Sequence, residues 1–105
     1  MVDASPEENQ KIAQYYEGKS EWAQAAKYYE KAGSLSRALK FYKQAGEDYI
    51  DTMIELVGKA KKDTLTNSLL DYLMGEDDYG EPKDPIYTYK VISLIKIYRI
   101  LNLYK

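Results

Sequence analysis

Small and aromatic residues recur in the first half of the chain at the spacing of one helical face. Tyr29 has an alanine four residues before it and another three residues after it, and Tyr42 has the same neighbours. Side chains at these spacings lie on one side of an α-helix, because a turn takes ~3.6 residues. The alanines allow a neighbouring helix to approach and the tyrosine fills the groove beside them. The pattern therefore predicts helices packed through a narrow apolar face.

The pattern repeats every thirteen residues. Residues 13–33 align with residues 26–46 at this offset, and nine of the 21 aligned positions are identical. Thirteen residues correspond to about three helical turns and a tight connection, at ~3.6 residues per turn. Neighbouring helices joined by such short connections must run antiparallel. Repetition of this kind is typical of an α-solenoid, in which each helix pair covers the apolar face of the next.

Serines and glycines mark the expected helix ends. Ser5 can cap a first helix, because Pro6 occupies its first position and Glu8 completes a capping box. Later glycines can adopt the left-handed conformation that ends a helix, and later serines can cap the next one. We therefore expect glycines to close the first three helices and serines to cap the second and third: Gly18, Gly33, Gly46, Ser20 and Ser34.

The strict period ends after Gly46, but helical spacing continues. We expect two further helices within residues 47–75, the second opening at Asp63 or Thr64, and an acidic loop at 76–85. The prediction for residues 1–105 is one helical-repeat domain or fragment, with three regular units in 6–46. Its fold class is all-α, a tetratricopeptide-like α-solenoid of about six short antiparallel helices.

The last segment, residues 86–105, is expected to form an apolar terminal helix. From residue 90 onward its polar residues recur every three positions and so circle the helix axis, which leaves no solvated face. Charges interrupt it too often for a membrane span, which needs roughly 20 mainly apolar residues. Its content of β-branched residues leaves a β-strand as an alternative to the helix. As a helix it would require partners on more than one side, and we expect self-association through Ile92, Ile95, Tyr98 and Leu101.

Composition excludes most catalytic chemistry. The 105 residues contain no cysteine and no histidine, which removes thiolate nucleophiles, imidazole bases and the usual zinc or haem ligands. The net charge of −2 gives no basic excess for nucleic acid. The acidic loop lacks the ligand register of an EF-hand, and the first residues do not resemble a signal peptide. We expect no enzyme, no catalytic or metal-binding residue and no cofactor.

Twelve tyrosines are the unusual feature of the composition. Those on the main helical face, such as Tyr29, are expected to pack in the core, with the ring covered and the hydroxyl near the surface. The aromatic residues one position before that face could instead line a groove for a partner. The candidate partner-facing residues of the repeats are therefore Tyr15, Tyr28 and Phe41.

The stretch from Ile54 to Tyr87 carries a more specific resemblance. Val57-Gly58-Lys59-Ala60, Leu65-Thr66-Asn67, Leu73-Met74-Gly75-Glu76 and Pro82-Lys83-Asp84 are similar to the C-terminal helical-repeat region of the intraflagellar transport protein 144 family. That family is a core subunit of intraflagellar transport complex A and carries WD-repeat propellers before its repeats. With the preceding repeats, the resemblance covers about residues 10–89; it fades after Tyr89.

The resemblance implies a protein-interaction scaffold that binds other complex A subunits. Such a scaffold would support retrograde ciliary transport and the entry of cargo into cilia, and would be located in the cilium or flagellum and the cytoplasm. It implies no catalytic residue. Two alternatives remain open at this point: an autonomous peptide-binding tetratricopeptide-type module, for which Lys27, Lys31 and Lys40 are the available cations, and a segment of a vesicle-coat-like solenoid.

Overall fold

The computed structural model describes residues 4–74 and 95–96, and within them every regular element is helical, which confirms the all-α class. The chain divides into two compact units, residues 1–50 and 51–105. Ile95 and Lys96, described within the last segment, are helical. The elements are α1 (Pro6–Gly18), α2 (Trp22–Lys31), α3 (Leu35–Ala45), the short 3-10 helix η1 (Glu47–Tyr49), α4 (Ile50–Ala60) and α5 (Asp63–Met74).

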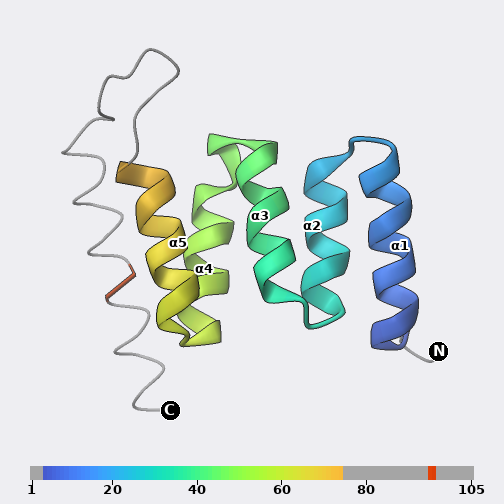
Figure 1. Cartoon of the computed structure of the whole chain (residues 1–105), viewed down its shortest axis with the longest axis horizontal. Coiled ribbons are helices and arrows are strands. Elements are labelled where there is room, and N and C mark those ends of the chain that lie inside the picture. The colour runs from blue at the N-terminus through green and yellow to red at the C-terminus, as the bar shows by residue number, and fades with distance from the viewer. Residues whose placement is uncertain (1–3, 75–94, 97–105) are drawn as a thin grey trace. The chain divides into compact units, whose positions relative to one another are not determined.

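The first unit is a row of antiparallel helices. Figure 1 shows α1, α2 and α3 side by side, with α2 packed against both of its neighbours. Four alanines at the contacts are completely buried, which allows the helix backbones to approach closely: Ala13, Ala25, Ala26 and Ala38. Of the three tyrosines expected in the core, Tyr29 and Tyr42 are 3% and 5% exposed and lie there, whereas Tyr16 is half-buried.

The start of α1 follows the sequence signal. The Glu8 N–H donates to the Ser5 hydroxyl at 3.1 Å, and the Ser5 N–H donates to the Glu8 carboxylate at 3.4 Å. This capping box satisfies backbone donors that the first turn of a helix leaves without partners. Ser34 stands at the cap position of α3, but its side chain makes no capping hydrogen bond.

The connection between α1 and α2 differs from the expectation. Gly18 is the last residue of α1 and has no positive φ, and the left-handed position falls on Ser20, with φ 59°. Glu21, not Ser20, stands at the cap position of α2. The Ser20 N–H donates to the Glu17 carbonyl at 3.0 Å and the Glu21 N–H to the Tyr16 carbonyl at 3.0 Å. These two bonds close α1 as a Schellman motif.

The connection between α2 and α3 is the same motif thirteen residues later. Gly33 has φ 84°, its N–H donates to the Glu30 carbonyl at 3.0 Å, and the Ser34 N–H donates to the Tyr29 carbonyl at 2.9 Å. Gly46 ends α3 with φ 113°. Ser20, Gly33 and Gly46 occupy the same position of the sequence repeat and all have positive φ, but Gly46 is itself the C-cap residue of α3, whereas Ser20 and Gly33 follow the C-cap. Gly33 and Gly46 confirm the prediction, whereas Gly18 does not close α1 in this way.

In the second unit, α4 and α5 each bury one apolar stripe. The residues that are at most 2% exposed are Met53, Ile54, Val57, Leu69 and Leu73. The α5 helix begins at Asp63, and Thr66 in its first turn is buried. The Thr66 hydroxyl donates to the Lys62 carbonyl at 3.2 Å, which satisfies that buried polar group. On the exposed side of α4, Lys59 pairs with Glu55 at 3.0 Å.

Candidate protein-binding groove

Two consecutive repeats of the first unit contain a hydrogen bond between a tyrosine and a glutamate of the preceding helix. The Tyr29 hydroxyl donates to Glu17 Oε1 at 2.7 Å, and the Tyr42 hydroxyl donates to Glu30 Oε1 at 3.2 Å. Both pairs are separated by twelve residues, and the second lies thirteen residues after the first. The repeat therefore specifies a polar contact between helices as well as their apolar packing.

Burial and this contact change the acidity of both tyrosines. Burial, followed by the hydrogen bond and the negative charge of Glu17, raises the pKa of Tyr29 to about 12. Burial, followed by the charge of Glu30 and its hydrogen bond, raises the pKa of Tyr42 to about 12. The neutral hydroxyl is favoured because ionisation would place a phenolate beside a carboxylate with little solvation. Both groups are donors at neutral pH.

Aromatic rings form a stack beside the first pair. Phe41 of α3 lies parallel to Tyr29 of α2, with ring centroids 5.5 Å apart, and parallel to Trp22 at the start of α2, at 5.7 Å. Such offset stacking adds to the apolar burial of the rings. Phe41 is 6% exposed. The stack fixes the distance between α2 and α3 along that face.

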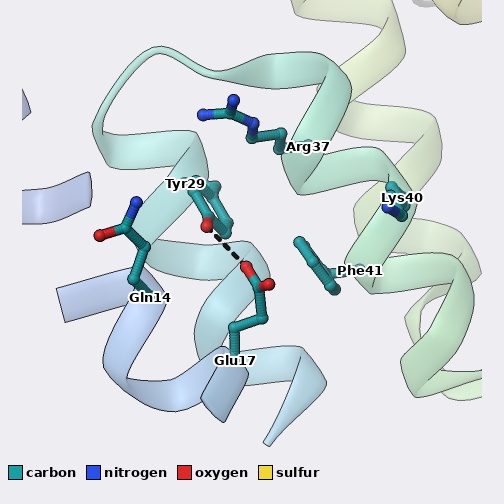
Figure 2. A pocket seen from close by; sticks show the side chains of 6 residues that line it. All are labelled: Gln14, Glu17, Tyr29, Arg37, Lys40 and Phe41. Atoms are coloured by element: carbon teal, nitrogen blue, oxygen red, sulfur yellow. Dashed lines mark hydrogen bonds between the residues drawn. The ribbon is translucent and has the colours of Figure 1, made fainter. Parts of the chain in front are cut away.

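A hollow of about 260 Å³ opens between α1 and α3. Figure 2 shows Gln14 and Glu17 of α1 on one side, Arg37 and Lys40 of α3 on the other, and the rings of Tyr29 and Phe41 between them. The lining comes entirely from the first unit. We call this hollow the α1–α3 groove.

The α3 side of the groove carries two cations one helical turn apart. The guanidinium of Arg37 lies 5.8 Å from the Tyr29 ring centroid, and the ammonium of Lys40 lies 5.5 Å from that of Phe41. Both residues are exposed. Neither has a carboxylate within ion-pair distance among residues 4–74. Cation–π contacts hold them over the rings while their donors stay available to a ligand.

A second aromatic cluster lies where α1 meets α2. Tyr16 and Tyr28 stack at 5.7 Å, and Tyr15 meets Tyr16 edge to face at 5.3 Å. The ammonium of Lys31 lies 5.0 Å from the Tyr28 ring centroid. Tyr15 is 57% exposed, whereas Tyr28 is half-buried. Tyr15 thus presents aromatic surface to solvent, and Tyr28 does so in part.

Phe41, which lies thirteen residues after Tyr28, has a different environment from Tyr28 and Tyr15. Phe41 was expected to line a groove for a partner, as Tyr15 and Tyr28 were; it lies at the α1–α3 groove, but the residue is only 6% exposed. The reason is Trp22, whose large ring covers Phe41 and whose counterparts in the neighbouring repeats are the smaller Asn9 and Leu35. Phe41 contributes to the floor of the α1–α3 groove and not to an exposed aromatic surface.

The candidate residues of the terminal segment fall mostly outside the described residues. Ile92, Tyr98 and Leu101 lie there, so their role in self-association stays a prediction. Ile95 is described and is 2% exposed, which corrects its expected place on the surface. Its aliphatic side chain is covered within the chain itself, as burial of apolar area favours.

Lys40 was recognisable in the sequence as a candidate cation, but the α1–α3 groove was not. Arg37 stands three residues before Lys40, so both share one face of α3, and this spacing was readable in the sequence. Gln14 and Glu17 on the opposite side carried no comparable signal. Their approach to α3 depends on the packing of α2 between the two helices.

Two further kinds of site were sought among the described residues. No group of acidic side chains in residues 4–74 is arranged to hold a metal ion. None of the described helices combines the length and the apolar character that crossing a membrane requires.

The chain is similar in sequence to a small part of a much longer protein. No family model matches it. It is 43% identical over 101 residues to WD repeat-containing protein 19 of Homo sapiens and 44% identical over 101 residues to that of Mus musculus. Each match covers 92% of this chain but 8% of the relative, so the chain spans a small part of their length. The chain is therefore similar to one segment of WD repeat-containing protein 19.

Proposed function

We propose that this chain is a protein-interaction segment of a scaffold subunit of intraflagellar transport complex A. The observation that carries the proposal is the identity of 43% to WD repeat-containing protein 19 across 92% of the chain. The resemblance of residues 54–87 to the intraflagellar transport protein 144 family supports it, because that family also joins WD-repeat propellers to helical repeats. The function would be non-enzymatic support of retrograde ciliary transport and of cargo entry into cilia.

The fold of the described residues supports such a role. Antiparallel helices that pack only against their neighbours build extended surfaces from helix faces and ends, and these surfaces bind other proteins. In the first unit, that surface includes the exposed Tyr15 and the α1–α3 groove. The proposed partners are the other subunits of complex A, and the proposed locations are the cilium or flagellum and the cytoplasm.

The test is recovery of the tagged full-length protein from ciliated cells, with its partners identified by mass spectrometry. We expect to recover complex A subunits in stoichiometric amounts. We also expect the full-length sequence to encode two WD-repeat propellers before this segment. A tagged helical-repeat protein of another complex, expressed at the same level, is the control. Recovery of vesicle-coat subunits, or of no complex A subunit, would overturn the proposal.

A second measurement tests the contribution of this segment. Replacing the completely buried Ala38 by Asp places a charge in the α2–α3 contact, whereas Lys27→Asp changes the charge of an exposed residue. Burial of an unpaired charge is strongly unfavourable. The Ala38 variant should lose complex A subunits and the Lys27 variant should retain them. Equal recovery with both variants would show that the segment does not contribute to assembly.

A further inference from the structure

We propose that the α1–α3 groove binds an acidic segment of a partner protein in extended conformation, with its carboxylates against α3. The proposal rests on the proposed function only in taking the occupant to be a protein. It names the chemistry of that occupant, which neither the homology nor the fold specifies.

The α3 side recognises carboxylates. Arg37 and Lys40 are exposed, share one face and have no ion-pair partner among residues 4–74. A guanidinium donates hydrogen bonds to both oxygens of a carboxylate in a fork, and an ammonium adds a point charge beside it. Their contacts with the Tyr29 and Phe41 rings limit the positions that the two side chains sample. Arg37 and Lys40 thus provide two adjacent, partly preorganised binding sites for carboxylates on α3.

The α1 side has the opposite polarity. Gln14 offers an amide, and Glu17 accepts the Tyr29 hydroxyl on Oε1 while Oε2 carries no hydrogen bond from the described residues. These groups can accept N–H donors of a peptide backbone. The Glu17 charge repels acidic side chains, so a bound acidic segment is oriented with its carboxylates toward Arg37 and Lys40. An extended segment can present acidic side chains to α3 and other side chains to α1, because successive side chains of an extended chain point to opposite sides.

The floor and the lining favour a polar occupant. Tyr29 and Phe41 are 3% and 6% exposed, so their rings offer little apolar surface to an aromatic or aliphatic anchor. The hollow of about 260 Å³ is lined mostly by polar and charged side chains, which favours a polar segment over the apolar face of a helix. A polar, extended and acidic segment fits the lining, the charge and the volume together.

The experiment measures binding of the 105-residue chain to a fluorescein-labelled peptide of alternating Glu and Thr, by fluorescence anisotropy. The variants are Arg37→Gln and Lys40→Gln. The matched control is Lys27→Gln, which removes the same charge at the equivalent position of the preceding repeat, where the exposed Lys27 does not line the groove. A peptide of alternating Gln and Thr tests the need for carboxylates. Circular dichroism verifies that each variant is folded.

We expect each groove variant to weaken binding by about fivefold or more, since each removes a charge-assisted contact, and the double variant to abolish it. Lys27→Gln should change the affinity less than twofold, and the Gln–Thr peptide should not bind. An equal loss with Lys27→Gln would show non-specific attraction and overturn the proposal. Absence of binding to the Glu–Thr peptide would also overturn it, and would leave the recovery of complex A subunits unaffected.

One further arm separates a peptide site from a site for small anions. Inorganic phosphate is added at a constant ionic strength, so that general screening of the charges does not change. We expect phosphate to displace the peptide only at concentrations far above that of the peptide. Displacement at equal concentration would show that the groove binds a lone anion and would overturn the assignment of an extended segment.

Discussion

The hydroxyl of Tyr29 donates a 2.7 Å hydrogen bond to the carboxylate of Glu17, which lies near the end of the preceding helix. The pair joins α1 to α2 beside the apolar contact of their alanines, and the same relationship joins α2 to α3 through Tyr42 and Glu30. The position thirteen residues after Glu30 is Lys43, so the pattern is not continued in the sequence beyond α3. Two consecutive contacts of one kind thus define the regular part of the repeat.

Replacing Tyr29 by Phe should destabilise the first unit. The change removes a hydrogen bond to a charged acceptor, for which the typical contribution is about 1.5–3 kcal/mol, and leaves the ring stack in place. We expect the free energy of unfolding, measured by urea denaturation, to fall by about 1–2 kcal/mol because the pair is partly solvated. Tyr42→Phe should cost less, since its hydroxyl lies 3.2 Å from Glu30.

Tyr15→Phe is the matched control, because Tyr15 is 57% exposed and no hydrogen bond of its hydroxyl is found among the described residues. It should change the free energy of unfolding by less than about 0.5 kcal/mol. If Tyr29→Phe and Tyr15→Phe had the same effect, the Tyr29–Glu17 contact would contribute nothing to stability.

Stability should fall at alkaline pH through the same tyrosines. Their pKa is about 12 in the folded chain and 10.0 ordinarily, so the folded state retains the two protons more strongly. The stabilisation is fully present below pH 10 and is lost as the pH rises from about 10 to about 12. Urea midpoints measured across this range should fall steeply for the natural chain. Lysines also titrate there, so the readout is the difference from the Tyr29→Phe, Tyr42→Phe double variant, whose midpoint should fall less steeply.

Substitutions at Ser20 and at Gly33 should change the stability of the chain in opposite directions. Ser20→Gly should stabilise the chain by about 1 kcal/mol, because φ 59° is unfavourable for a residue with a Cβ. Gly33→Ala should destabilise it by about 1 kcal/mol, because φ 84° is likewise unfavourable for a residue with a Cβ. No steric clash adds to this cost, because a Cβ at Gly33 would meet no atom within 4 Å.

Gly18→Ala is the comparison for this pair, because Gly18 is helical and a Cβ there would also meet nothing within 4 Å. It should stabilise α1 by about 0.5–1 kcal/mol. Thermal denaturation of the three variants measures the signs. A destabilising Ser20→Gly change would contradict the assignment of the left-handed position to that residue.

The alanines between the helices should not tolerate enlargement. Ala25 of α2 is completely buried, so Ala25→Leu would force the helices apart and cost about 1–3 kcal/mol or more. Gln24→Leu adds an apolar side chain at the neighbouring exposed position and should change the free energy of unfolding by less than about 0.5 kcal/mol. Equal stability of the two variants in urea would show that close helix approach is not required.

Much of the fold was predictable from particular residues. The capping box of Ser5 and Glu8, the left-handed Gly33 and Gly46, and the inward Tyr29 and Tyr42 were all readable, because each depends on the residue type and on neighbours along the same helix. The end of α1 was predicted wrongly. Gly18 was the locally favourable terminator, whereas packing of α2 on α1 continues the helix through it and places Ser20 in the less favourable conformation.

The sequence by itself determined the helices of the first unit, their thirteen-residue period and the face that each one buries, since these follow from spacing within a single element. The tertiary structure decided which carboxylate each tyrosine reaches, why Phe41 is covered while Tyr15 is exposed, and how Arg37 and Lys40 come to face Gln14 and Glu17. The physical reason is that these relationships join different helices. Residues at equivalent positions of a repeat share their local preferences but meet different neighbours, and those neighbours set burial, charge and accessibility.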